Sequence, residues 1–258
     1  MEAGFRRCAD PDRCRHCGLP PQPATACCCT GSRGITLNFI DVPSPNFNER
    51  TKPVSLIVLH YTGMESGKAA LDRMRDPDAK VSAHYMVEED GRIFRLVDED
   101  RRAWHAGVSE WAGETDINSI SIGIEMVNGG HDFGLPDYPD RQIHAGISLV
   151  KEIMVRHDIA AHRIVGHSDI APGRKQDPGE KFPWPLLSEA GCSIMPKVLT
   201  GAGDSSRQLA RIGYGLEAGE AAVIKAFQRR FRPARVDGQL DDETKALINA
   251  VARLSQQA

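Results

Sequence analysis

The sequence contains no long hydrophobic run and no large excess of charge of one sign. Among its 258 residues, no apolar stretch approaches the roughly 20 residues that a bilayer-spanning helix needs. The 32 Lys and Arg residues against 35 Asp and Glu residues give a net charge of −3, whereas a nucleic-acid partner would favour a clearly basic face. Apolar residues make up 41% of the chain, which is enough for a packed core. We therefore expect a packed protein with no membrane span and no nucleic-acid partner.

The cysteines are distributed too unevenly for a disulfide framework. Six of the seven fall within the first 29 residues, and the seventh is Cys192. Cys14 and Cys17 have the C-x-x-C spacing of some metal sites, but no matching second pair follows. The same region has few apolar residues, four prolines and no periodicity, so we expect residues 1–34 to be a disordered Cys-rich tail. A small metal site is the alternative.

Hydrophobic periodicity predicts strands interspersed with helices. The segment 120–127 alternates apolar residues with Ser121, Gly123 and Glu125, which indicates a strand with one special face. Ser66 is a candidate N-cap for a following helix, and Asp90-Gly91 is a turn pair that favours a hairpin. The predicted strands are 54–61, 84–88, 92–97 and 120–127, and the predicted helices are 67–75 and 139–157. This order favours an α/β fold with a central mixed β-sheet flanked by helices.

Two histidines follow apolar runs that read as strands. His60 closes the run from 54 to 59, and His167 closes the short run 164–166. Asp177 follows in a Pro/Gly-rich loop. Two histidines and one carboxylate can form a three-ligand catalytic metal site with one position left for water. The donor types alone do not select zinc, because imidazole also suits copper, iron and nickel.

The segments around these residues resemble one enzyme family. They are LIVLHYTG (56–63), VSAHYMVEEDGRIFRLV (81–97), RRAWHAGVSEWAG (101–113), NSISIGIEMVN (118–128) and GHSDIAPGRKQDPGEKFPW (166–184). On them, residues 51–185 resemble the zinc-dependent N-acetylmuramoyl-L-alanine amidases of the AmpD/AmiD type. The resemblance implies one Zn²⁺ per chain, held by His60, His167 and Asp177.

The resemblance also implies the reaction: hydrolysis of the amide between the lactyl group of N-acetylmuramic acid, or its anhydro form, and L-alanine. The substrate would be peptidoglycan or muropeptides, in cell-wall turnover or recycling. A non-catalytic peptidoglycan-recognition protein is the alternative from another class, although the chain has all three ligand positions. A zinc amidase with a substrate outside the cell wall is a third possibility.

Two further residues are candidates for the chemistry. Glu125 is a carboxylate in an otherwise apolar strand, where an unpaired charge is costly to bury. The resemblance implies that it acts as the general base, and orientation of a ligand histidine is the alternative. Lys175 precedes Asp177 by two residues, and the resemblance implies that it stabilises the oxyanion; a solvated lysine is the alternative. His105 and Tyr61 are expected to contact the substrate.

The C-terminal part resembles a second, smaller module. Residues 193–208 are rich in small and polar residues and favour a linker. Helical periodicity follows at 220–231 and after the candidate N-cap Asp241. The signature Gln228, Val236-Asp237-Gly238 and Thr244 resembles the three-helix peptidoglycan-binding module of wall hydrolases. We therefore predict a catalytic domain at 35–192 and a peptidoglycan-binding three-helix domain at 209–258. The alternative is that these helices pack on the catalytic domain.

The compartment follows less directly from the sequence. Arg6 and Arg7 are not followed by an apolar region of about 7–15 residues, as a secretory signal would require. We therefore expect a cytoplasmic protein, with the periplasm as the alternative that a wall-binding module would favour. We expect it to act as a monomer.

Overall fold

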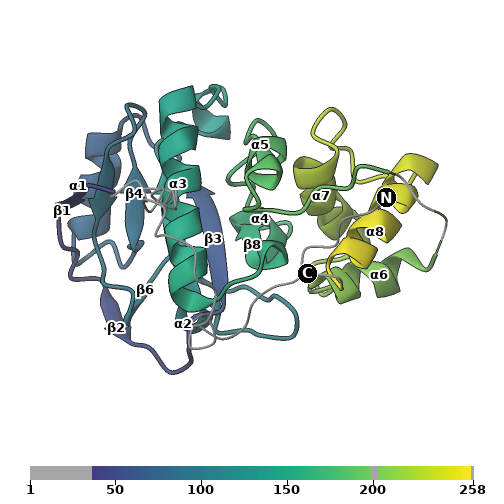
Figure 1. Cartoon of the computed structure of the whole chain (residues 1–258), viewed down its shortest axis with the longest axis horizontal. Helices are drawn as coiled ribbons and strands as arrows, with labels where there is room; N and C mark the ends of the chain where they lie inside the picture. The colour runs from purple at the N-terminus through teal and green to yellow at the C-terminus, as the bar shows by residue number, and fades with distance from the viewer. Residues whose placement is uncertain (1–36, 199–200, 202, 257–258) are drawn as a thin grey trace, which may run out of the picture. The chain divides into compact units, whose positions relative to one another are not determined.

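A six-stranded mixed sheet forms the centre of the protein. The computed structural model describes residues 37–198, 201 and 203–256, so the expected tail 1–34 lies outside the described residues. The sheet has the order β1-β5-β4-β7-β3-β8 (Figure 1). Its strands are β1 (Phe39–Asp41), β5 (Ile93–Arg95), β4 (Tyr85–Val87), β7 (Ser121–Met126), β3 (Leu56–Tyr61) and β8 (Ile164–Gly166). The hairpin β4–β5 is antiparallel and the other neighbours are parallel, which confirms the predicted mixed sheet.

Helices flank this sheet, as predicted. They are α1 (Gly67–Arg75), α2 (Ile117–Ile120), α3 (Asp140–His157), α4 (His167–Ile170), α5 (Trp184–Glu189), α6 (Ser205–Ile212), α7 (Glu220–Phe231) and α8 (Asp242–Leu254). Single 3₁₀ turns occur at η1 (His131–Phe133) and η2 (Ala161–Arg163), and a small antiparallel pair is formed by β2 (Phe47–Glu49) and β6 (Arg101–Ala103). Ser66 and Asp241 cap α1 and α8 by accepting backbone N–H bonds. Among the helices of the described residues, none has the length and apolarity to cross a bilayer.

Along β7, large apolar side chains alternate with small or polar residues. Ile122 and Ile124 are fully buried in the cluster that includes Ile143 and Leu149 of α3, which lies across their face of the sheet (Figure 1). Ser121, Gly123 and Glu125 point the other way, because successive side chains of a strand alternate. The one special face predicted for residues 120–127 is therefore present.

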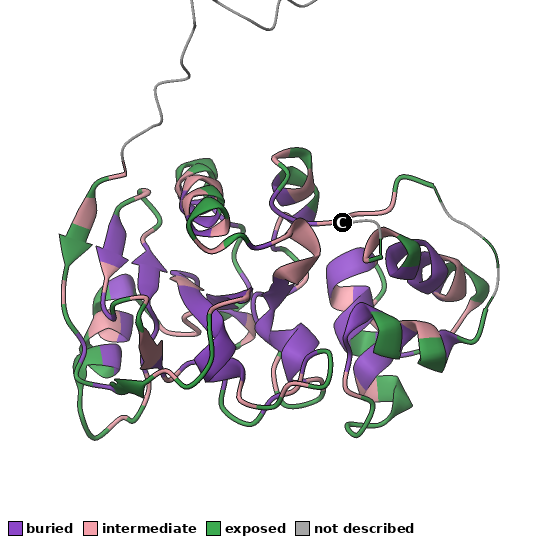
Figure 2. Ribbon diagram, turned by 60° about the horizontal axis from the view of Figure 1, so that its bottom comes forward, coloured by how far each residue is buried: buried purple, intermediate pink, exposed green. Residues whose placement is uncertain are grey.

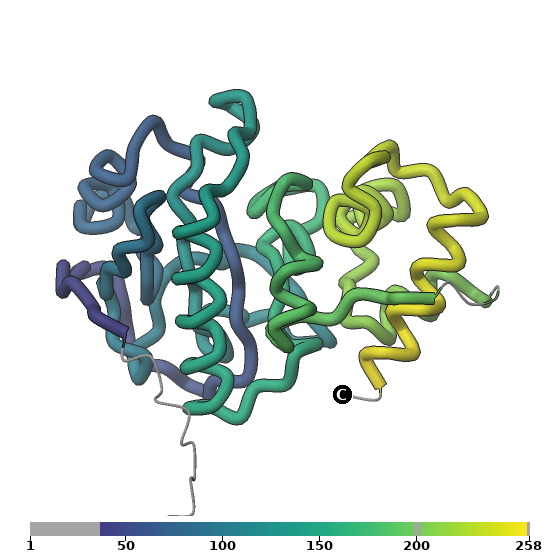
Figure 3. Tube along the Cα trace, turned by 45° about the horizontal axis from the view of Figure 1, so that its top comes forward, coloured from purple at the N-terminus to yellow at the C-terminus, as the bar shows by residue number. Residues whose placement is uncertain are grey.

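The C-terminal helices share a hydrophobic core with the sheet. One buried cluster joins Leu56 and Val58 of β3 with Phe227 of α7 and Ile248 of α8. Figure 2 shows buried residues on both the strands and these helices, and Figure 3 shows the chain running from α5 into α6–α8. Helix α6 begins at Ser205, inside the segment 193–208 for which we expected a linker. Its first turn is capped by the Asp204 side chain, and its apolar residues Leu209 and Ile212 are buried.

A buried carboxylate ties the hairpin to the end of α3. Glu99 accepts hydrogen bonds from the Tyr85 hydroxyl and from the side chains of Arg156 and His157. Burial alone would raise the pKa of Glu99, but these donors outweigh it and hold that pKa below its usual value. The ionised carboxylate is thus part of the folded structure.

Candidate metal centre and active site

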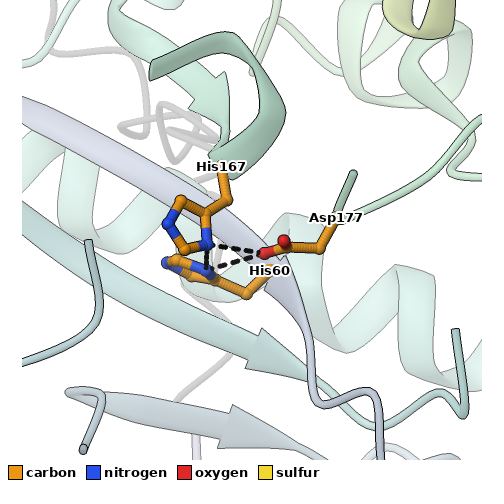
Figure 4. A group of neighbouring side chains, drawn as sticks. All are labelled: His60, His167 and Asp177. Atoms are coloured by element: carbon orange, nitrogen blue, oxygen red, sulfur yellow. Dashed lines mark hydrogen bonds and ion pairs between the residues drawn. The ribbon is translucent and has the colours of Figure 1, made fainter. Parts of the chain in front are cut away.

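The structure brings the three predicted metal ligands together. His60 lies at the end of β3, His167 is the first residue of α4, and Asp177 lies in the following loop (Figure 4). The Nδ1 atoms of the two histidines are 3.0 Å apart, and each lies 2.9 Å from the Asp177 Oδ2 atom. All three residues are at least 95% buried, with exposed fractions of 2%, 3% and 5%. Three donor atoms of a possible metal site therefore converge on one point.

One ring nitrogen of His167 is engaged by a backbone carbonyl group, which leaves the other nitrogen available to bind a metal ion. Its Nε2 atom lies 3.0 Å from the Ala106 carbonyl oxygen, which can only accept a hydrogen bond. Nε2 therefore carries a hydrogen, and in the tautomer with that single hydrogen the Nδ1 atom has a lone pair that faces Asp177. A ligand histidine commonly has its other nitrogen bonded to a backbone carbonyl in this way.

A chain of hydrogen bonds identifies the free nitrogen of His60 by the same reasoning. The Ser121 hydroxyl donates to the Ile117 carbonyl oxygen at 2.6 Å, so its oxygen accepts from His105 Nε2 at 3.2 Å. His105 Nδ1 is then an acceptor for the Nε2 hydrogen of His60, 3.0 Å away. Consequently His60 Nδ1 also presents a lone pair to the cluster.

These assignments leave a cluster of electron pairs without a hydrogen between them. Burial lowers the pKa of His60 to about 4, which keeps its ring neutral near pH 7. Burial alone would raise the pKa of Asp177, but positive charge and hydrogen-bond donation from His167 and His60 lower it far below its usual value. Neutral rings whose Nδ1 atoms present lone pairs do not supply that charge, so a charged carboxylate at this place needs a cation. Two nitrogen lone pairs and an anionic oxygen within 3.0 Å of one another repel unless a cation lies between them. The donor set therefore fits a metal ion such as zinc.

Glu125 lies beside this cluster. It is the register partner of His60 on the neighbouring parallel strand β7, so the two side chains share one face of the sheet. Its Oε2 atom is buried and has no hydrogen-bond partner among the described residues. Burial and the nearby Asp177 charge raise the pKa of Glu125 well above its usual value. A carboxylate with a raised pKa can take up and release a proton near neutral pH.

His105 contacts the Nε2 atom of His60, whereas the Nδ1 atom of His60 contacts Asp177. It is 6% exposed, and both of its ring nitrogens face protein partners. Its ring lies over the bare Cα of Gly123, where an added Cβ would meet the ring at 2.5 Å. This arrangement orients the His60 ring, and because His105 also lines the cavity beside the predicted ligands, its substrate contact stays a prediction. In the sequence, Gly123 was the signal for this packing, because a strand position without a side chain leaves room for the His105 ring.

The predicted residues line one cavity. Its volume is about 360 Å³, and it contains the three predicted ligands together with Glu125, Lys175, Tyr61 and His105. The Tyr61 hydroxyl also contacts the His131 ring at 3.0 Å. Arg174 lines this cavity and an adjoining larger one of about 760 Å³, which contains none of the ligands. The smaller cavity has the groups needed for chemistry, whereas the larger one offers only room beside it.

Sequence reasoning missed the residues that support the ligands. The side chain of Asn118 accepts the backbone N–H groups of His105 and Ala106, at 3.0 and 2.8 Å, and so fixes the loop that contacts both ligand histidines. Ser121 ends the hydrogen-bond chain behind His60. Both lie in NSISIGIE, where small polar residues interrupt an apolar strand, and that interruption was the available signal.

The chain is similar to known amidases over most of its length. Residues 50–180 match the family described as N-acetylmuramoyl-L-alanine amidase. The sequence is 36% identical over 231 residues to the N-acetylmuramoyl-L-alanine amidase AmiD of Escherichia coli K12, covering 77% of this chain and 82% of that protein.

Two solved structures of amidases resemble this one. The first is AmiD from E. coli in complex with the substrate anhydro-N-acetylmuramic acid-L-Ala-D-γ-Glu-L-Lys. It has a TM-score of 0.71 and 31% identity, covering 83% of this chain and 99% of that chain. The second is AmpDh3 from Pseudomonas aeruginosa, with a TM-score of 0.72 and 36% identity, covering 83% and 98%. On its sequence, its fold and its arrangement of ligand residues, this chain is an enzyme that belongs to the N-acetylmuramoyl-L-alanine amidase family.

Proposed function

We propose that this protein hydrolyses the amide between the lactyl group of N-acetylmuramic acid, or its anhydro form, and L-alanine in peptidoglycan or muropeptides. One zinc ion would be held by His60, His167 and Asp177. When bound, zinc polarises a carbonyl group and lowers the pKa of a water molecule. The similarity to AmiD, whose structure contains a muropeptide, supports this substrate class.

The residues around the metal centre supply the proton transfers and the charge stabilisation. Glu125 accepts a proton from the attacking water and later delivers it to the amine nitrogen of L-alanine as the C–N bond breaks. Lys175 lines the same cavity, so its ammonium group can stabilise the negative charge that develops on the carbonyl oxygen. The cross-strand neighbour of Glu125 on β4 is the fully buried Met86, and burial of the Glu125 carboxyl maintains its raised pKa.

This proposal depends most on one observation: donor atoms of His60, His167 and Asp177 converge beside Glu125, whose buried Oε2 atom has no hydrogen-bond partner among the described residues. The test is zinc content and turnover of N-acetylmuramoyl-L-Ala-D-γ-Glu-L-Lys, followed by the appearance of a free L-alanine amine. We expect about one zinc per chain and cleavage at that amide. In Asp177→Ala, zinc and turnover should both be lost while the fold survives, because the core strands do not depend on the loop. Full zinc occupancy in this variant would overturn the ligand assignment.

We also propose that the helices at 209–258 form the peptidoglycan-binding part, with 35–192 as the catalytic part. The signature around Gln228 supports this, since its side-chain oxygen accepts the N–H groups of Asp237 and Gly238 and its amide contacts Thr244. The test uses full-length Glu125→Gln bound to insoluble sacculi. Excess soluble muropeptide, which fills the catalytic groove, should leave much of the protein bound. Complete release would show that the groove is the only contact with the wall.

Two further expectations have direct tests. The monomeric state predicts a single-chain mass in light scattering. The cytoplasmic location, as opposed to the periplasmic alternative, is tested by fractionating cells that make the native protein. Neither result bears on the metal ligands.

A further inference from the structure

Helix α4 controls the position of two of the three ligands. His167 is its first residue, and the Ser168 N–H donates to the carbonyl oxygen of Asp177 at 2.8 Å. The Asp169 side chain accepts the N–H of Gly166, also at 2.8 Å, and so fixes the turn from β8 into the helix. A small displacement of α4 would therefore move His167 and the Asp177 loop together.

The other hydrogen bonds of Asp169 come from the C-terminal helical part. Asp169 is completely buried, and its Oδ1 accepts the hydroxyl of Tyr214, which follows α6, at 2.6 Å. Its Oδ2 accepts from Nη1 of Arg230 in α7 at 2.9 Å. Burial and the Asp169 charge raise the pKa of Tyr214 well above its usual value, so the hydroxyl keeps its proton and can donate. These two donors follow Asp169 in the sequence by 45 and 61 residues.

Arg230 is itself held in one orientation. It is 4% exposed, and its second terminal nitrogen donates to the Ile164 carbonyl oxygen of β8 at 2.9 Å and to Ser193 at 3.2 Å. Its guanidinium lies 4.1 Å from the centre of the Trp184 ring. The planar guanidinium therefore donates hydrogen bonds to both β8 and α4, the two elements that meet at His167.

We infer that Tyr214 and Arg230 are positioning residues of the metal centre, acting through Asp169 on α4 so that His167 and Asp177 keep their places. The C-terminal helical part then supports the site through Asp169, as well as sharing a hydrophobic core with the sheet. This inference rests on the proposed zinc function for its affinity readout. It says nothing about whether the same helices also bind the cell wall.

The test compares two buried tyrosines that make the same kind of hydrogen bond. Tyr214→Phe removes the bond to Asp169, and the matched control Tyr85→Phe removes the 2.7 Å bond to Glu99. Both rings stay packed, at 2% and 4% exposure, so each variant loses only one hydroxyl donor to a carboxylate. Zinc affinity is measured by competition with a chromophoric chelator, at a temperature far below unfolding. Amide hydrogen exchange of residues 166–170 is measured in metal-free protein.

We expect Tyr214→Phe to weaken zinc binding about tenfold, the lower end of the effect of mutating groups that orient metal ligands. The exchange of residues 166–170 should become faster. Tyr85→Phe should keep the zinc affinity and the exchange of residues 166–170 close to wild type. Its melting temperature should fall by about as much as that of Tyr214→Phe. Arg230→Lys, which keeps the charge but loses the planar guanidinium, should weaken zinc binding at least as much as Tyr214→Phe.

Equal effects of the two tyrosine variants on zinc affinity and exchange would overturn the inference, because stability alone would then explain them. No effect of Tyr214→Phe on either readout would overturn it as well. If wild-type protein binds no zinc, the proposed function fails, and the exchange measurement alone decides whether Tyr214 positions α4.

Discussion

Phe227 offers a direct test of whether the C-terminal helices unfold together with the catalytic sheet. Its ring is completely buried in the shared core, 4.7 Å from the Phe231 ring and 6.2 Å from the Tyr214 ring, measured between centroids. Replacing a buried Phe by Ala costs about 3–5 kcal/mol, from lost burial and from the cavity left behind. That is a large part of a typical stability of about 5–15 kcal/mol. At roughly 2–4 °C per kcal/mol for a chain of this size, Phe227→Ala should melt about 6–20 °C lower.

The fluorescence of Trp104 is the assay, in a background that carries Trp111→Phe and Trp184→Phe, because Trp111 and Trp184 contact Tyr214 and Arg230 of the C-terminal part. Trp104 instead contacts Asn48, whereas the mutation is in α7. We expect one cooperative transition that shifts to lower temperature when followed by fluorescence and by helical circular dichroism. Phe133→Ala, at a side chain that is 55% exposed, should stay within a degree or two of wild type. A tryptophan transition that stays at the wild-type temperature while helix content melts earlier would refute the shared-core reasoning.

Three other predictions follow from the site and its surroundings. Glu125→Gln should keep zinc but lose about 10²–10⁴-fold in turnover, because the amide side chain cannot accept the proton. A loss of only a few-fold would show that Glu125 orients a ligand histidine instead. Gly123→Ala should lower zinc affinity, because its Cβ would overlap the ring of His105; unchanged affinity by chelator competition would show that the ring can move at no cost. The pKa of Glu99 is lower in the folded state than its unfolded value near 4.5, so its stabilising effect is present above pH 4.5 and is lost as pH falls further. The stability difference between wild type and Glu99→Gln, from urea unfolding, should therefore shrink below pH 4.5, and a constant difference would contradict this.

Local patterns were sufficient to predict the elements that carry the ligands. The alternation in 120–127 and the apolar run before His60 correspond to β7 and β3, because half-buried and fully buried strands leave different periodicities. The three residues predicted as ligands were singled out because each follows such a run or lies in a long family motif, and the structure places them close together. What brings them to one point is the parallel pairing of β3 with β7 and β8, and no single segment encodes that pairing.

The features that were not predicted depend on contacts between distant residues. Asp169 lies in the motif GHSDIAPG, yet nothing near it indicates that its partner is Arg230. The start of α6 was hidden because its first turn is made of serine, arginine and glutamine, and its apolar residues come only at positions 209 and 212. The direction of the His105 side chain was also not predictable, because a loop has no periodicity to assign a face.

The bond from Arg230 to Asp169 also has a consequence for protein synthesis. A chain is made from its N-terminus, and its early parts can fold while later parts are still on the ribosome. All three proposed metal ligands are complete once residue 177 has been made, but Arg230, which we infer to hold α4, is added more than fifty residues later. A nascent or prematurely terminated chain would therefore have every ligand and still lack a settled metal centre. Competence for catalysis would arrive only when the last helices emerge and fold.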